Sequence, residues 1–596
     1  MGFWDFVYRR FWWFGQYIVK VYPNLPDMLR KSGFHIYYEA YASFVGFMTV
    51  LAAIVASGLM FLDAILLGPI YIIPLLIPVP FILMVILVYL PSIVGGERAG
   101  GIEGEIPYAT AYLSIMVTSG VSPYVAFERL GRSKAIFMKT SELSQRFSLM
   151  VKCLGKDPLT AFSMLARHTS SASVRDLFSG YIATVRAGGD VGDYLTKKAR
   201  LFFSELLVKI KIIADRLSGL LEAYLALILL TTLSLSTMYF VNMAIPVASL
   251  PSLRGSFMGI ILYILLPFLS LMIIYMTDLM QYKEPWIDMR PYIFFAGVTI
   301  PVSVFLIFFT VVLPKILPPA SPLIDNAFVA GVKLVMTAPN TLSQFMFGSP
   351  IDDYLHSSMI ITMVLILATI PAAAYEIKVS REYTVIRGIT KFLRDLVEVR
   401  KTGLSPERSI IDLSRRDYGL FTPFLRKIGM QLSLGVPLSR IVREILNKIV
   451  VWRAKVMLYM LTDAIEVGGG TIEILENLAW FAESVDELDD ERKKSLRILL
   501  VVPYMGAILT VSAIILLAIF MGALTYSVAA YAAAAELTLP AIILNVYLMG
   551  LVAGKVSGGS IAAGFKHSLF LMLITLLVII ASPVIKAAFI GITAGV

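Results

Sequence analysis

Cysteine and histidine are scarce in this sequence, which has one cysteine, Cys153, and only four histidines among 596 residues. A single thiol forms no disulfide within the chain and is too few for a thiolate metal site. The histidines, at positions 35, 168, 356 and 567, are widely separated along the chain. We therefore expect neither a disulfide scaffold nor a metal, and we expect no cofactor.

Charged residues are also few, at 15% of the chain against roughly 25% in ordinary soluble domains. Hydrophobic residues make up 58%, and the mean hydropathy is +0.80, so the chain is not a water-soluble protein. A helix needs about 20 apolar residues to span a bilayer. The sequence predicts about nine such spans, near residues 43–67, 70–90, 219–247, 257–277, 292–313, 358–375, 498–525, 537–554 and 568–590. Pro74, Pro78 and Pro80 predict an irregular second span.

The charges are concentrated in residues 1–42, 95–217 and 376–497, which together hold 43 of the 51 lysines and arginines. Because lysine and arginine accumulate on the cytoplasmic side of membrane proteins, we place all three stretches there. The N-terminus is then cytoplasmic and the C-terminus lies outside. The predicted order is an N-terminal interfacial segment (1–42), a transmembrane hairpin (43–94), a first cytoplasmic bundle (95–217), spans three to six with an outer loop at 314–357 (218–375), a second bundle (376–497) and spans seven to nine (498–596).

The two long polar stretches resemble each other at an offset of about 280 residues. Three short motifs recur in the same order: SGVSP (119–123) against TGLSP (402–406), LGKDPL (154–159) against LGVPL (434–438), and RAGGD (186–190) against EVGGG (466–470). Each stretch shows helical spacing of apolar residues and no strand signal. We therefore predict an all-α protein in which two homologous cytoplasmic helical bundles have arisen by duplication.

The repeated motifs predict specific helix ends. Gly120 and Gly403 follow the last apolar residue of a helix, where glycine adopts the left-handed conformation cheaply. Pro123 and Pro406 stand at the first position of the next helix, after a serine cap. A second set of helix stops and starts is predicted at Gly188, Gly189, Asp190, Gly468, Gly469 and Gly470.

Catalytic motifs are not evident. Gly155-Lys156 is followed by Asp157, so it is not a Walker phosphate-binding loop. Ala187-Gly188-Gly189-Asp190 is similar to the Gly-x-Gly-Asp of membrane aspartyl proteases, but a helix cap explains it better. We therefore expect the chain not to be an enzyme.

Ionisable residues within the predicted spans are limited to Asp63, Glu222 and Lys586, each near a span end where a side chain can reach the interface. Proton- or ion-coupled transport normally uses charges near the midplane of the bilayer. Gly550 and Gly554 match the small-xxx-small pattern of helix packing.

The first residues combine aromatic side chains with Arg9 and Arg10. This pattern fits a helix lying in the membrane interface, and it fits equally well an aromatic belt beside the first span. The basic excess of the first bundle fits a solvated face, a contact with anionic lipid or docking of an acidic partner protein. Binding of nucleic acid is not expected, because no aromatic platform accompanies the charge.

Taken together, the six motifs and the adjoining spans resemble the type II secretion system F-domain family, the assembly platform of type IV filament machines. A chain with about nine spans is more similar to the archaeal members of the family, which serve archaella and archaeal pili. The resemblance implies that a cytoplasmic hexameric secretion ATPase docks beneath the platform and that pilin subunits are lifted into a growing filament. Pairing of two copies as a homodimer is left open. Charge and position suggest motor contact by Arg129, Arg132, Lys134, Arg492, Lys493 and Lys494.

Two alternatives stand beside this interpretation. A polytopic secondary transporter would suit nine spans and an internal repeat, although four spans follow the first bundle and three the second. A membrane-embedded protease would need two membrane-facing aspartates, which the sequence does not offer.

Overall fold

The computed structural model describes residues 3–32, 34, 36–66, 79–169, 171–244, 261–281, 288–312, 327–347, 352–524 and 528–594. These residues form helices and turns, with no strand among them, which confirms the predicted all-α fold. Nine of their helices are long and apolar enough to cross a membrane. The chain divides into two compact units, which we describe separately. One consists mainly of Met1–Phe202 with Asp463–Ile474, and the other contains most of the remaining chain.

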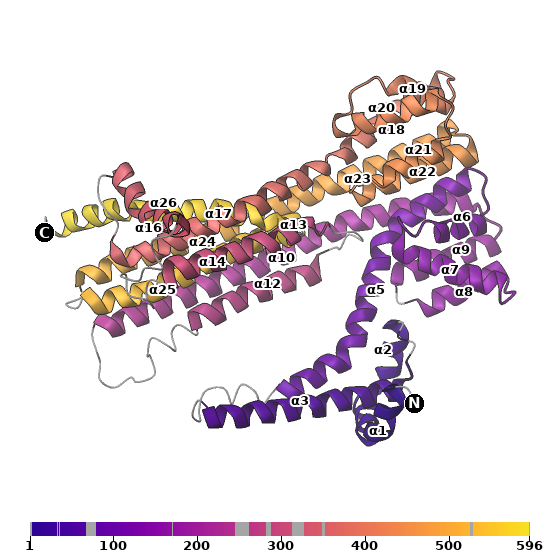
Figure 1. Ribbon diagram of the computed structural model, residues 1–596. Coiled ribbons are helices and arrows are strands. Elements are labelled where there is room, and N and C mark those ends of the chain that lie inside the picture. The colour runs from indigo at the N-terminus through magenta and orange to yellow at the C-terminus, as the bar shows by residue number, and fades with distance from the viewer. Residues whose placement is uncertain are drawn as a thin grey trace. The chain divides into compact units, whose positions relative to one another are not determined.

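The first unit contains the N-terminal helices and the first bundle (Figure 1). Its helices are α1 (Phe3–Val21), α2 (Leu25–Ser32), α3 (Tyr38–Leu66), α5 (Val79–Thr118), α6 (Pro123–Arg132), α7 (Met138–Lys152), α8 (Pro158–His168) and α9 (Ala172–Arg186). The apolar helix α3 packs against α5, in the region where a transmembrane hairpin was predicted. Pro80 lies at the start of α5, whereas Pro74 and Pro78, where an irregular span was predicted, lie outside the described residues.

The second unit contains most of the spans and the second bundle. After the long helix α10 (Val191–Ala244), which begins in the first unit, come α12 (Leu266–Met280), α13 (Arg290–Phe294), α14 (Ile300–Ile307), α16 (Ala327–Phe347) and α17 (Asp353–Glu382). The second bundle follows with α18 (Val385–Lys401), α19 (Pro406–Leu413), α20 (Thr422–Ser433), α21 (Leu438–Leu446), α22 (Trp452–Gly468) and α23 (Ile472–Ile498). The last spans are α24 (Val501–Leu524), α25 (Val528–Gly558) and α26 (Gly564–Ala594).

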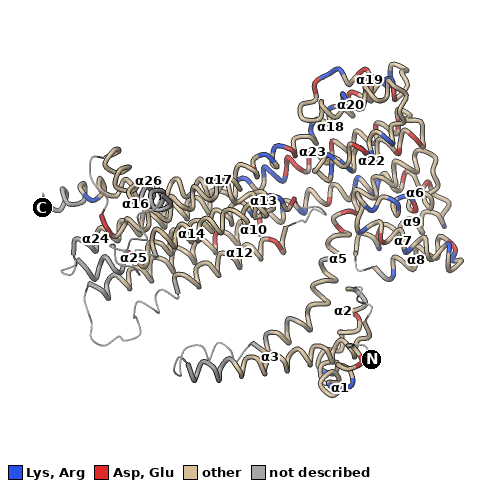
Figure 2. The backbone as a smooth tube through the Cα atoms, viewed as in Figure 1, with Lys and Arg blue, Asp and Glu red and all other residues tan. Residues whose placement is uncertain are grey.

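The distribution of charge separates bundles from spans. Lysine, arginine, aspartate and glutamate colour the bundle helices α6, α7, α19, α22 and α23, while the middle parts of α12, α14 and α25 carry almost none (Figure 2). Charge is costly in the hydrocarbon core of a bilayer, so this pattern is that of a multi-pass membrane protein.

The duplication extends well beyond the bundles. Helices of the two halves begin at matching positions, 283 residues apart at Pro123 and Pro406 and 280 apart at Pro158 and Leu438. Beyond the bundles, α10 continues the first bundle into a span, and α23 with α24 does the same for the second. In the same order, α12 corresponds to α25, and α13 with α14 corresponds to α26.

This correspondence allows the spans to be grouped by repeat. The sixth span, α17, continues into the second bundle with only Tyr383 and Thr384 between it and α18. It therefore corresponds to the first part of α5 and belongs to the second repeat. Each repeat then has one span before its bundle and three after it, while along the chain four candidate spans follow the first bundle and three follow the second.

Helix α25 is the most enclosed of the nine candidate spans, with 83% of its apolar window buried. Small residues let its neighbour α26 approach closely. A side chain at Gly554 would overlap the backbone of Gly564, and one at Gly550 would overlap that of Ser568. The small-xxx-small pattern therefore marks a tight helix crossing.

Candidate functional site

The first pair of predicted turns is built alike in the two bundles. Gly120 has a φ of +85° and Gly403 a φ of +90°, in the left-handed region that only glycine adopts without strain. Pro123 and Pro406 are the first residues of α6 and α19. A side-chain cap is present only in the second repeat, where the Ser405 hydroxyl accepts the N–H of Arg408 at 3.3 Å.

The second set of turn glycines shows how the repeats have diverged. Gly188 is left-handed in the first repeat, and Gly469 and Gly470 are left-handed in the second. Gly188 thus corresponds to Gly469 and not to Gly468, a shift of one residue from the sequence match. Asp190 caps α10, because its Oδ1 accepts the N–H groups of Gly192 at 2.8 Å and Asp193 at 3.2 Å.

In the first unit, the glycine-rich turn of the second repeat packs on the first bundle. A side chain at Gly468 would lie 2.6 Å from the Cβ of Ser119, so the two turns are in direct contact. The Tyr112 hydroxyl donates to Asp463 Oδ2 at 2.6 Å, and Arg129 Nη1 lies 3.8 Å from Asp463 Oδ1. The first bundle is therefore completed by residues of the second repeat, and the bundle half of α5 is buried almost throughout.

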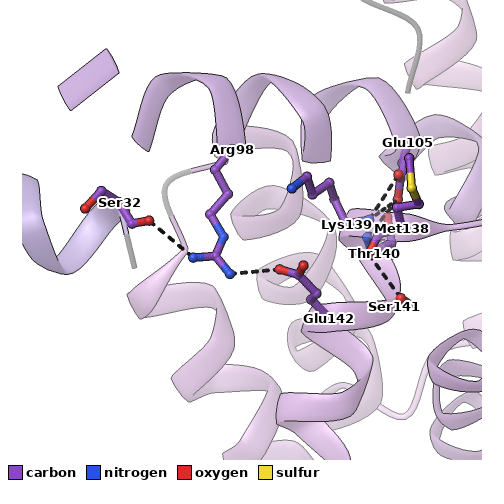
Figure 3. A network of polar contacts seen from close by, with 8 residues as sticks. All are labelled: Ser32, Arg98, Glu105, Met138, Lys139, Thr140, Ser141 and Glu142. Carbon is purple, nitrogen blue, oxygen red and sulfur yellow. Dashed lines mark hydrogen bonds and ion pairs between the residues drawn. The ribbon is translucent and has the colours of Figure 1, made fainter. Parts of the chain in front are cut away.

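Two glutamates of α5 cap two other helices of the first bundle. Helix α7 begins after Phe137, whose side chain offers no cap. Glu105, which is fully buried, takes that place by accepting the N–H groups of Lys139 at 3.0 Å and Thr140 at 2.7 Å (Figure 3). A carboxylate at a helix N-terminus satisfies free donors and interacts favourably with the helix dipole.

Glu103 does the same for α9. Its Oε1 accepts the Ser171 hydroxyl at 2.6 Å and the Ser173 N–H at 3.1 Å. Residues two apart on a helix point to nearly opposite sides, so Glu103 and Glu105 reach two different helices. The sequence Glu-Gly-Glu therefore holds α7 and α9 to the central helix α5.

Arg98 joins the N-terminal segment to the first bundle. Its guanidinium bonds Glu142 Oε2 of α7 at 2.8 Å and the carbonyl of Ser32, the last residue of α2, at 3.3 Å (Figure 3). A cation at a helix C-terminus is favourable because the unpaired carbonyls there carry partial negative charge.

In the second unit, a ladder of ion pairs joins α18 to α23. The pairs are Lys401–Glu476 at 3.2 Å, Arg394–Glu483 at 2.5 Å and Arg387–Asp490 at 2.8 Å. From one pair to the next, the residue number falls by seven on α18 and rises by seven on α23. This is the heptad pattern of an antiparallel coiled coil. The side chains are exposed, so each pair contributes at most about 1 kcal/mol, and the ladder chiefly sets the register.

The corresponding spans of the two repeats meet within the second unit. Ser270 donates to Asn545 Oδ1 at 3.3 Å, Lys555 Nζ lies 2.5 Å from Asp278 Oδ1, and Gln281 donates to the Val556 carbonyl at 2.8 Å. The partners are 275, 277 and 275 residues apart, so α12 and α25 run side by side in the same direction. Because this separation nearly equals the repeat offset, corresponding faces of the repeats touch.

Carboxyl groups on the bundle surfaces have hydrogen-bond or ion-pair partners, and these partners lower the pKa of two of them. In α6, the Lys152 ammonium beside Glu128 lowers the pKa of that carboxyl. Before α20, the hydroxyl of Thr422 and the N–H of Gly419 donate to Asp417 Oδ1 at 2.8 and 3.0 Å and lower its pKa.

The six residues predicted to contact a motor fall in both units. Arg132 and Lys134 are exposed on the first bundle, and Arg129 lies beside Asp463. Lys493 and Lys494 are exposed on α23, whereas Arg492 is partly buried and donates to the Gly558 carbonyl at 3.4 Å. Arg492 therefore joins α23 to the end of α25.

Two of the three ionisable residues predicted in the spans have described side chains. Lys586 Nζ bonds Asp352 at 2.7 Å, and Glu222 is exposed beside Ser218. The Asp63 side chain lies outside the described residues. Sequence reasoning missed Arg98, Glu103 and Glu105, since a cap supplied from another helix leaves no local pattern. The ladder did leave a signal, the seven-residue spacing of Arg387, Arg394 and Lys401.

Comparison with known proteins places these features in a family. A family model described as type II secretion system (T2SS), protein F, matches residues 109–238 and again 392–521. Each match runs from the first helix of a bundle into the span that follows it. An uncharacterized protein of Methanocaldococcus jannaschii is 20% identical over 458 residues, which cover 72% of this chain and 70% of that protein. No solved structure matches the chain.

Proposed function

This chain belongs to the type II secretion system F-domain family, and from that premise we propose that it is the membrane assembly platform of an archaeal type IV filament, either a pilus or an archaellum. It couples a cytoplasmic hexameric ATPase to the insertion of pilin subunits into the filament. The observation that carries the proposal is that two copies of the family domain each continue into membrane spans. The similarity to a protein of Methanocaldococcus jannaschii supports the archaeal assignment.

A platform of this kind must pass movement from a motor in water to helices in the bilayer, and long helices suit this task. Helix α10 has 54 residues, which at 1.5 Å per residue is about 80 Å of continuous helix. In the second repeat, α23 and α24 are interrupted only at Leu499 and Leu500. We propose that both helices act as levers between a bundle and its spans.

The bundles face the cytoplasm in this proposal, with the N-terminus inside and the C-terminus outside. The orientation follows from the basic residues of the bundles and of the segments next to the spans. Because the sequence holds no Walker motif, the energy comes from a separate ATPase. The exposed basic residues Arg132, Lys134, Lys493 and Lys494 are proposed as contacts for that motor.

A secondary transporter is the second candidate, and two structural observations favour it. Each repeat has one span before its bundle and three after it, so the spans are themselves duplicated. In addition, the Tyr224 hydroxyl, the Ser270 hydroxyl and the Asn545 side chain form a buried polar group where α10, α12 and α25 meet. Polar groups at the junction of repeats are typical of transporter binding sites.

Electron microscopy of cells without this gene, beside a complemented strain, tests the proposal. Loss of one class of surface filament and its return on complementation would establish the platform role and name the filament. An unchanged set of filaments under inducing conditions would refute it and favour transport, which uptake measurements in vesicles would then examine.

A further inference from the structure

The N-terminal helix α1 crosses the beginning of the first span, α3. The Tyr8 hydroxyl donates to Glu39 Oε2 at 2.8 Å, and the rings of Phe11 and Phe47 lie 5.3 Å apart. The crossing is tight, because a side chain at Gly46 would meet the Phe14 ring at 2.5 Å. Helix α1 is therefore a separate element held against one end of a span, and not an extension of that span.

Three different faces run along α1. The packed face carries Val7 and Ile18, which are buried against the neighbouring helices of the first unit. A second face carries Phe6, Trp13 and Tyr17, whose exposed fractions are 60%, 62% and 63%. The helix is kinked at Phe11, so Phe6 lies before the kink, and Trp13 and Tyr17, four residues apart, share one side of the helix after it. The third face carries the exposed polar residues Asp5 and Arg9 before the kink and Gln16 and Lys20 after it, with the exposed Trp12 among them.

Each of these faces requires a different environment. Large exposed aromatic side chains that lie close together are unfavourable in water, and Trp and Tyr are enriched where a bilayer meets water. The polar face needs water or lipid headgroups. Helix α1 crosses α3 at residues 39–47, in the first third of that helix, so both remaining faces lie near one end of the candidate span.

We propose that α1 binds the surface of the anionic bilayer leaflet, lying in the plane of the interface. Phe6, Trp13 and Tyr17 enter the boundary between headgroups and acyl chains. Arg9, Arg10 and Lys20 contact anionic headgroups, against a single acid, Asp5, on the helix. Of the two interpretations that the sequence left open, the crossing geometry favours the interfacial helix.

The interface helix also has a direct connection to the first bundle. Helix α2, which follows α1 after a short turn, ends at Ser32, and its carbonyl accepts from Arg98. Arg98 in turn pairs with Glu142 of α7. Binding of α1 to the membrane surface would therefore hold the base of the first bundle at the interface, independently of whether the chain assembles filaments.

Tryptophan fluorescence provides the test, since three of the six tryptophans, at 4, 12 and 13, lie in α1. The full-length protein with Trp13 as its one tryptophan, the other five replaced by Phe, is reconstituted into phosphatidylcholine vesicles containing phosphatidylglycerol. We expect lipid brominated near the headgroup to quench Trp13 roughly twofold more than lipid brominated near the chain end. The matched control keeps only Trp480, in the second bundle, and should not be quenched.

The charge requirement is tested with the Arg9→Gln/Arg10→Gln variant of the same protein. Its quenching should fall, and the dependence of wild-type quenching on phosphatidylglycerol should disappear. Trp13 quenched no more than Trp480 would overturn the proposal. Stronger quenching from the chain end would show a membrane-spanning α1 and would also overturn it. Equal quenching in vesicles of phosphatidylcholine alone would overturn the role of anionic lipid.

Discussion

Asp278 and Lys555 lie at nearly matching positions of the two repeats and pair with each other where α12 meets α25, with 2.5 Å between Oδ1 and Nζ. Two identical repeats would bring like charges together at this contact. The ion pair therefore exists only because the two repeats have diverged in sequence. It joins corresponding helices of the two repeats through two different side chains. The Lys555 side chain is almost fully buried and also donates to the Gly559 carbonyl at 3.0 Å.

Neutralising one partner of this pair should destabilise the spans more than neutralising both. Lys555→Met leaves the Asp278 charge without its partner, and we expect the free energy of unfolding to fall by roughly 1–3 kcal/mol, between the values for exposed and buried pairs. The double variant Asp278→Asn/Lys555→Met should recover most of the loss. Thermal unfolding of the purified protein in nanodiscs measures both. A single variant as stable as the wild type would contradict the prediction.

Proline in either long helix should stop filament assembly while leaving the protein in the membrane. Leu206→Pro in α10 and Leu488→Pro in α23 each remove a backbone hydrogen bond and cost about 3 kcal/mol of helix stability. Filaments are counted by electron microscopy, and the protein is quantified in the membrane fraction.

The matched controls place proline at the first residue of the same helices, in Val191→Pro and Ile472→Pro. Proline is tolerated there, so these variants should assemble filaments. Normal filaments in both Leu206→Pro and Leu488→Pro would show that neither helix acts as a lever.

Removing the buried carboxylate of Glu105 should loosen α7. In Glu105→Ala the N–H groups of Lys139 and Thr140 lose their acceptor, at a cost of about 1–3 kcal/mol. Hydrogen exchange followed by mass spectrometry should show faster exchange in the first turn of α7. Glu142→Ala, which removes a half-buried ion pair on the same helix, is the control. Equal protection of α7 in the two variants would argue against the cap.

A methyl group at the crossing of α25 and α26 should separate the two spans. Gly554→Ala overlaps the backbone of Gly564, and overpacking of this kind costs typically about 1–3 kcal/mol. Gly219→Ala in α10 meets no atom within 4 Å and should be neutral or stabilising by about 0.5–1 kcal/mol. Thermal unfolding distinguishes them, and an unchanged Gly554→Ala would refute the close crossing.

Acid should weaken the turn that precedes α20. Hydrogen bonds from Thr422 and Gly419 lower the pKa of Asp417 below its value in the unfolded chain, about 3.9. The stabilisation is complete above that value and is lost as the pH falls through the lower pKa of the folded state. Hydrogen exchange of α20 in the wild type and in Asp417→Asn should differ at neutral pH and converge below about pH 4. A difference that persists in acid would exclude the carboxylate as its cause.

Local sequence patterns predicted the helices, the nine spans and the first pair of turns, because these depend on neighbouring residues. A glycine followed three residues later by a proline defines this turn whatever surrounds it, at Gly120 and Pro123 in the first repeat and at Gly403 and Pro406 in the second. The interfacial character of residues 3–21 was one of two open interpretations, since hydropathy does not reveal where a helix packs.

Contacts between distant segments could not be predicted in this way. The caps from Glu103 and Glu105 depend on α7 and α9 beginning beside α5, and nothing near residue 105 in the sequence indicates this. The equivalence of the spans was missed because apolar residues are interchangeable in lipid. Membrane helices therefore retain less of a duplication in their sequence than the turns of the bundles do.

The donation of residues 463–474 to the first bundle has a consequence for biosynthesis. Tyr112 meets its partner Asp463 only after the ribosome has added the 351 residues that separate them and the intervening spans have entered the membrane. At 5–20 residues per second this is a delay of about 18–70 seconds. During that time the surface of the first bundle that Asp463 and Gly468 later cover is without its native contacts. This surface is therefore a target for chaperones during translation.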